Sequence, residues 1–175
     1  MKFVFLFTLF LFSSSLVAGE PVTLDEKLEP LRPFVGKTWR GEFKGGDAEK
    51  KTIDVSRWER ALNGKAIKIV HSINDGMYGG ETIVRWDPEK KQITYFYFST
   101  AGFYTTGTMT RIEKKIVCNE MVSGGAAGTT EVRSTYELRD DGTLLNKAEY
   151  LKGQEVTGSR EVLYKEAPGA EVRFR

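Results

Sequence analysis

The sequence has little of the chemistry on which most metal sites and nucleophile sites depend. Its 175 residues include one cysteine, Cys118, and one histidine, His71. A single cysteine excludes an intrachain disulfide, and a zinc site would have to rely on carboxylates, which is uncommon. No G-x-S-x-G turn is present, and Ser72, next to His71, would point to the opposite face of a strand. We expect no metal site and no catalytic residue, and Cys118 as a small apolar side chain.

An excess of charge of one sign is also lacking. Lysine and arginine number 26 and aspartate and glutamate 24, and the two signs are interspersed along the chain. There is no basic stripe of the kind that neutralises phosphates, so we expect no nucleic-acid partner.

Only one long apolar run occurs, and it lies at the N-terminus, in MKFVFLFTLFLFSSSLVAG. Lys2, an apolar core and small residues at positions 17–19 are typical of a signal peptide, and the core is too short for a membrane span of about 20 residues. We expect residues 1–19 to be removed, the protein to be periplasmic or secreted, and the mature chain to lack a membrane span.

The five prolines lie outside the alternating runs described below, as the hydrogen bonding of strands requires. Two of them, Pro30 and Pro33, are expected to end a short helix over residues 23–31, TLDEKLEPL. Thr23 and Glu26 form a capping box there, and three leucines fall on one face.

From Thr38 onward, short alternating β-branched and aromatic runs are separated by Gly, Asn and Asp. They predict ten strands near residues 38–44, 51–60, 65–73, 78–87, 92–100, 103–111, 116–122, 129–139, 143–151 and 155–165. The short connections favour antiparallel neighbours and leave no room for crossover helices. A closed or nearly closed all-β barrel would hide both edges, with a two-sheet sandwich as the alternative. The expected domains are thus 1–19 (signal peptide), 20–37 (N-terminal segment), 38–165 (barrel) and 166–175 (C-terminal tail).

A short helix, then G-K-T-W at the first strand, then a ten-strand meander resembles the lipocalin-like (calycin) superfamily. The motif W-R-G-E is similar to the motif found in nitrobindin-type barrels and in small bacterial exported lipocalin-like domains. The chain lacks the T-D-Y motif of lipocalins. It also lacks a histidine in EAPGAEVRFR, near the C-terminus, where nitrobindin-type proteins ligate haem, so the cofactor is unknown.

This resemblance also implies a structural plug at one barrel end. In lipocalin-like proteins, an arginine from a late strand commonly packs over the tryptophan of the opening motif. The resemblance therefore implies that Arg160 packs over Trp39 here. Gly36 and Gly41 would complete the plug, with Gly41 leaving room beside the ring. The alternative is that Arg160 binds a ligand carboxylate in the interior.

Aromatic residues are dense between Tyr95 and Tyr104. In ITYFYFST, Tyr95 and Tyr97 share one face and Phe96 and Phe98 the other, so two rings enter the barrel whichever face is inward. Apolar pockets with a few polar groups are typical of small-molecule sites. The expected ligand-binding residues are His71, Tyr95, Tyr97, Tyr136, Asn146 and Arg160.

These patterns favour a non-catalytic barrel that binds a small, largely apolar molecule, with or without a carboxylate. Two alternatives stay open: an enzyme acting on a small hydrophobic substrate at the barrel mouth, and a structural or interaction module with a filled core. A cavity of roughly 300 Å³ or more with aromatic walls would favour binding. A cluster around His71 with a carboxyl of shifted pKa would favour catalysis.

Overall fold

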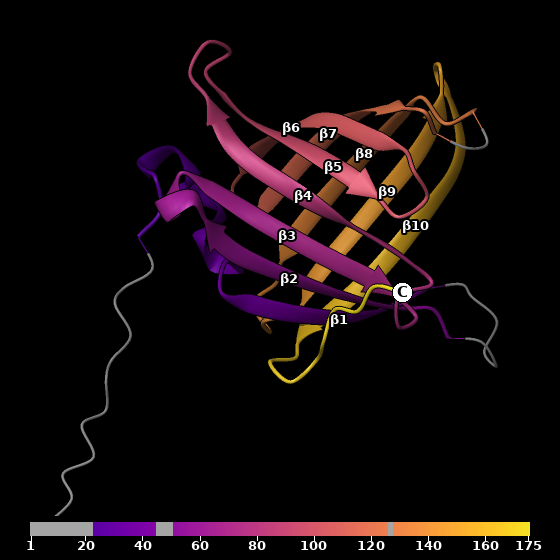
Figure 1. Cartoon of the computed structure of the whole chain (residues 1–175), viewed down its shortest axis with the longest axis horizontal. Helices are drawn as coiled ribbons and strands as arrows, with labels where there is room; N and C mark the ends of the chain where they lie inside the picture. The colour runs from indigo at the N-terminus through magenta and orange to yellow at the C-terminus, as the bar shows by residue number, and fades with distance from the viewer. Residues whose placement is uncertain (1–22, 45–50, 126–127) are drawn as a thin grey trace, which may run out of the picture.

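The chain folds into a closed barrel of ten strands. The computed structural model describes residues 23–44, 51–125 and 128–175, so the expected signal peptide and the Gly45-Gly46 turn lie outside the described residues. Each strand is antiparallel to its neighbours in chain order, and β1 closes the barrel against β10 (Figure 1). The strands are β1 (Lys37–Phe43), β2 (Ile53–Ala61), β3 (Ala66–Ile73), β4 (Tyr78–Asp87), β5 (Gln92–Ser99), β6 (Tyr104–Ile112), β7 (Lys115–Ser123), β8 (Glu131–Leu138), β9 (Leu144–Lys152) and β10 (Glu155–Glu166). The predicted meander is confirmed, and the sandwich alternative is wrong.

Side chains alternate between the interior and the outer face along the strands, as the sequence predicts. On β1, Trp39 and Gly41 are buried and Arg40 is exposed. On β5, where the sequence left both faces open, the tyrosines point inward: Tyr95 is 4% exposed, whereas Phe98 is 54% exposed.

The N-terminal helix differs from the prediction in type and in its residue range. It is a 3-10 helix, η1 (Glu26–Phe34), and its cap is the side chain of Asp25, which accepts a hydrogen bond from the Lys27 N–H at 3.0 Å. Pro30 and Pro33 lie inside it and do not end it. With three residues per turn, buried positions recur every third residue, at Leu28, Leu31 and Phe34. The predicted capping box of Thr23 is therefore wrong; the Thr23 carbonyl instead accepts from Arg60 Nε at 2.6 Å.

One end of the barrel is filled by a hydrophobic cluster beneath η1. Leu28 and Leu31 are fully buried, and Phe34 packs on Trp58 with ring centroids 5.3 Å apart. Trp39 and Leu144 belong to the same cluster. The predicted position of the helix, across one end of the barrel, is confirmed.

The tail after β10 lies against the outside of the barrel. The Arg173 N–H donates to Ser72 Oγ at 3.1 Å, and Ser72 on the outer face of β3 is only 2% exposed. A second short helix, η2 (Leu62–Gly64), joins β2 to β3. Within residues 23–44, 51–125 and 128–175, no helix has the length and apolar character to cross a membrane.

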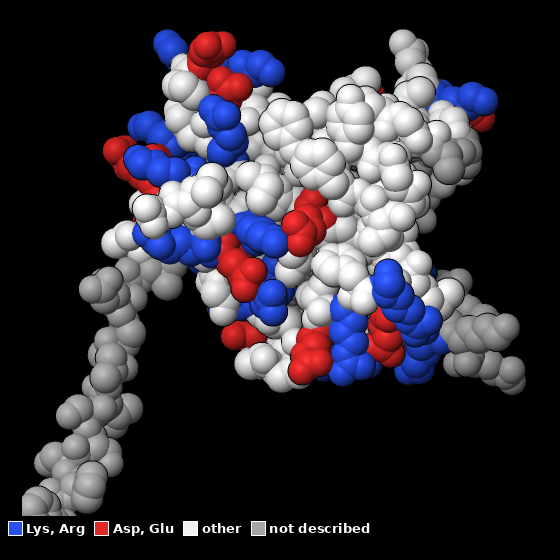
Figure 2. Space-filling view, viewed as in Figure 1, with Lys and Arg blue, Asp and Glu red and all other residues white. Residues whose placement is uncertain are grey.

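Charged side chains are unevenly spread over the outer surface. Figure 2 shows both signs interspersed over the left and lower parts of one face, and an uncharged area over its upper part. Large apolar side chains are exposed on the outer faces of β5, β6 and β7, namely Phe96, Phe98, Tyr104 and Met121. Phe98 and Tyr104 stack there with ring centroids 6.3 Å apart.

Candidate functional site

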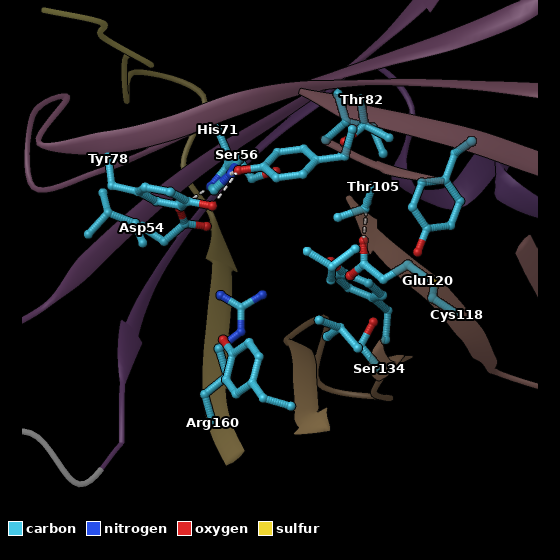
Figure 3. Close-up of a pocket in the computed structure, with 18 of the residues that line it drawn as sticks. Asp54, Ser56, His71, Tyr78, Thr82, Thr105, Cys118, Glu120, Ser134 and Arg160 are labelled. Atoms are coloured by element: carbon cyan, nitrogen blue, oxygen red, sulfur yellow. Dashed lines mark hydrogen bonds and ion pairs between the residues drawn. The ribbon is translucent and has the colours of Figure 1, made fainter. Parts of the chain in front are cut away.

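The barrel encloses a cavity of about 330 Å³ next to the filled end. Its walls combine aromatic rings from several strands with a small set of polar and charged side chains (Figure 3). Five of the six predicted ligand-binding residues line it: His71, Tyr95, Tyr97, Tyr136 and Arg160. Their role in binding stays a prediction.

The sixth, Asn146, does not line the cavity. It is fully buried on β9, and its Nδ2 donates to the Thr135 carbonyl at 3.2 Å. Its Oδ1 has no hydrogen-bond partner among the described residues. A residue facing inward can therefore still lie beneath its neighbours and out of reach of a ligand.

His71 is held by two polar side chains, although the sequence places it among isoleucines. Its Nδ1 lies 2.8 Å from Asp54 Oδ1, and its Nε2 lies 3.0 Å from the Tyr97 hydroxyl. Further hydrogen bonds extend from Asp54 at one end and from Tyr97 at the other. Tyr164 donates to Asp54 Oδ2 at 2.7 Å, and the Tyr78 and Tyr97 hydroxyls are 2.8 Å apart.

The tyrosines of this network remain neutral hydroxyls at physiological pH. Burial raises the pKa of Tyr97 well above its usual value of about 10. Burial also raises the pKa of Tyr78, against the opposing effects of its hydrogen bond with Tyr97 and the positive charge of Arg160. The network thus offers O–H donors and acceptors to the interior, and no phenolate.

Arg160 brings a positive charge into the cavity. It is the only lysine or arginine among the described residues that line the cavity. Figure 3 shows its guanidinium pointing into the open centre, with Asp54 and His71 on one side and Glu120 on the other. Its Nε is buried without a partner, and no ion pair of Arg160 occurs in the described part of the chain. Because arginine keeps its proton, this charge is available to an anion.

The predicted stacking of Arg160 on Trp39 is wrong. The guanidinium lies over the ring of Phe43 instead, 5.6 Å from its centroid, and Lys37 Nζ lies 5.3 Å from the ring of Trp39. The register explains the difference. Trp39 pairs with Glu166 on β10, which is six residues from Arg160, or about 20 Å along a strand.

The two glycines of the predicted plug have other roles. Gly41 leaves room for β10, since a Cβ there would lie 2.6 Å from Val162 Cγ1 and 2.7 Å from Tyr164 Cδ1. Gly36 adopts a φ of 81° in the turn before β1, where its N–H donates to the Trp58 carbonyl at 2.8 Å.

Glu120 on β7 faces Arg160 from the opposite wall. Its Oε2 accepts a hydrogen bond from Thr105 Oγ1 at 2.6 Å. Burial raises the pKa of Glu120, while the Thr105 hydrogen bond and the charge of Arg160 oppose the rise. The cavity thus contains a carboxyl that takes up a proton more readily than one in water.

Several polar residues that line the cavity were not predicted from the sequence, and four of them matter most to its chemistry: Asp54, Tyr78, Glu120 and Tyr164. For three of them, the alternation of inward and outward positions along the strand already indicated that the side chain faces the interior. Asp54 is two residues from Ser56 and Glu120 is two residues from Cys118, and all of these line the cavity. Tyr164 shares the inward face of β10 with Arg160. Tyr78 begins its strand, where alternation gives little warning.

The site does not fit haem or a metal ion. Both ring nitrogens of His71, the one histidine of the sequence, are engaged by protein side chains. In the described ranges, no group of three or more His, Cys, Asp or Glu side chains could hold a metal ion.

Comparisons with known proteins support the fold and give no activity. No family model matches the chain, and no curated protein matches it. Among solved structures, the chain is similar to the crystal structure of Rv2717c from M. tuberculosis, with 13% sequence identity and a TM-score of 0.61. The match covers 83% of this chain and 99% of that one. At this identity the likeness shows the fold alone, a closed β-barrel.

Proposed function

We propose that this protein is an exported barrel that binds a small, largely apolar acid in its interior and does not transform it. The observation that carries the proposal is the guanidinium of Arg160, whose buried Nε has no partner within the described ranges, in a cavity of about 330 Å³ with aromatic walls. Leaving a charge without a partner in such a site is costly, and an anionic ligand would remove that cost.

The size and the lining of the cavity agree with this proposal. Its volume lies at the lower end of the range for small-molecule sites, so the ligand is small. The apolar walls would hold the body of the ligand, and Arg160 would hold its acidic group by charge-assisted hydrogen bonds. A cavity of this volume argues against the filled-core module.

Catalysis is the second candidate, because one observation favours it. Asp54 and His71 are paired as in sites where a carboxylate orients a basic imidazole, and the pKa of Glu120 is raised. Binding without turnover remains the first candidate because Nε2 of His71 faces the hydroxyl of Tyr97, and no serine or cysteine takes that position.

Native mass spectrometry of the protein purified from its own compartment tests the proposal. We expect a co-purifying small acid that is retained under gentle ionisation and lost when the barrel is unfolded. Incubation of the recovered acid with fresh protein should return it with unchanged mass and structure. A neutral or cationic ligand would contradict the proposed role of Arg160, and chemical conversion of the acid would favour the enzyme.

A further inference from the structure

The hydrogen bonds from Asp54 to Tyr78 form one continuous chain across the cavity wall. They run from the Asp54 carboxylate through the His71 ring and the Tyr97 hydroxyl to the Tyr78 hydroxyl, with heavy-atom separations of 2.8, 3.0 and 2.8 Å. The chain begins at a carboxylate that only accepts when ionised, and this fixes Nδ1 of His71 as a donor. The direction of the remaining bonds then depends on the proton at Nε2.

With neutral His71, the hydroxyl protons of Tyr97 and Tyr78 both point toward the imidazole. Nε2 is then an acceptor, so Tyr97 donates to it and Tyr78 donates to Tyr97. Tyr78 then presents only lone pairs to the interior. This arrangement disfavours an anion near Tyr78.

With protonated His71, the chain reverses. Nε2 now donates to the Tyr97 oxygen, and the Tyr97 hydroxyl donates either to the Tyr78 oxygen, at 2.8 Å, or to the Gly79 carbonyl, at 3.4 Å. When Tyr97 donates to Tyr78, the shorter of the two contacts, the Tyr78 hydroxyl is free to donate into the cavity. Histidine is the side chain whose charge ordinarily changes between pH 5 and 8.

Arg160 connects this chain to the proposed ligand. Tyr78 and Arg160 both line the cavity, and Figure 3 shows both side chains directed toward its open centre, so an anion held by the guanidinium would share this space with the Tyr78 hydroxyl. We propose that binding of an anion at Arg160 is coupled to proton uptake by His71 through Tyr97 and Tyr78, so that the acidic ligand is held more tightly at lower pH. This inference rests on the proposed function.

Other titratable groups lie around His71, and the test must distinguish proton uptake by His71 from proton uptake by these groups. Glu120 acts electrostatically on His71 and itself takes up a proton readily, so it is a rival source of proton uptake. The titratable and charged groups that face the imidazole are Asp54 on β2, Tyr78 on β4, Tyr97 on β5, Glu120 on β7, and Arg160 and Tyr164 on β10.

Isothermal titration calorimetry with decanesulfonate tests the coupling, because a sulfonate stays anionic from pH 5 to 8. Titrations at one pH in buffers of different ionisation enthalpy measure proton uptake directly. We expect uptake of a fraction of a proton near pH 7. Affinity should rise as pH falls, by up to about tenfold per pH unit, the limit for one linked proton. Decanol, the neutral control, should bind without proton uptake.

Four variants locate the coupled proton. His71→Asn, Tyr97→Phe and Tyr78→Phe should each abolish the uptake, and Glu120→Gln should retain it. Tyr104→Phe removes an exposed hydroxyl from the outer face and is the matched control for folding. Uptake that persists in Tyr78→Phe, or that disappears in Glu120→Gln, would overturn the inference. Binding of the sulfonate without proton uptake would do the same, and absence of binding at every pH would refute the proposed function itself.

Discussion

At the scale of single residues, the interior of the barrel is set by close contacts between β1 and β10. Gly41 shows this most clearly, because Val162 and Tyr164 occupy the space that its side chain would need. Both neighbours are buried, and Tyr164 is held by its hydrogen bond to Asp54. Tyr164 cannot move without disturbing the network around His71.

Gly41→Ala should therefore destabilise the fold by about 1–3 kcal/mol, the usual cost of overpacking. The midpoint of urea unfolding measures this loss. Gly158→Ala is the matched control, because its Cβ would approach only Tyr150 Cδ2, at 3.7 Å. Equal midpoints for the two variants would contradict the close packing of β1 on β10.

Cys118 should be unreactive in the folded protein. It is 2% exposed, and burial, together with the charge of Glu120, raises the pKa of its thiol to about 12. Since the thiolate is the reactive form, dithiobis(nitrobenzoate) at pH 8 should label the protein only after unfolding. Labelling of the native protein within minutes would show that the thiol is accessible and ionised.

Glu120 should make stability depend on pH. Its pKa is raised in the folded state, so the folded protein holds this proton more tightly than the unfolded chain. The free energy of unfolding should therefore fall as pH rises from the ordinary carboxyl range through the raised pKa. Urea unfolding at a series of pH values should show a smaller fall for Glu120→Gln, and an unchanged pH profile would contradict the raised pKa.

At the scale of elements, η1 and the strands illustrate different limits of sequence reasoning. Alternation correctly placed Trp39 inward because strand period and burial agree there. The helix was misplaced because Asp25 competes with Thr23 as a cap, and because prolines are tolerated in a 3-10 helix that needs fewer regular hydrogen bonds. The position of Arg160 could not be predicted, because it depends on the register between β1 and β10, which are far apart in sequence.

The packing of η1 across one end of the barrel should contribute strongly to the free energy of unfolding. Leu31 lies on the buried face of η1 and is fully buried, so Leu31→Ala should leave a cavity and cost about 2–5 kcal/mol. Leu62→Ala, at a leucine that is 73% exposed, is the control and should change stability little. Thermal or urea unfolding compares the two. A small loss for Leu31→Ala would mean that η1 does not seal the barrel.

At the scale of the whole molecule, closure of the barrel creates an interior in which opposite charges stay apart. The closed sheet has no free edge, and the cluster beneath η1 fills one end. Asp54 is satisfied by His71 and Tyr164, and Glu120 accepts from Thr105, whereas Arg160 lies over the ring of Phe43 and its Nε has no hydrogen-bond partner among the described residues. The account therefore depends on what the guanidinium binds.

Calorimetric titration with decanoate and with decanol, in the wild type and in Arg160→Gln, tests this claim most directly. The substitution should weaken decanoate binding by roughly ten- to hundredfold, because a charged hydrogen bond contributes about 1.5–3 kcal/mol. Decanol binding should change little, and Arg40→Gln on the outer face should leave both affinities unchanged. Equal decanoate affinity in the wild type and Arg160→Gln would contradict the account.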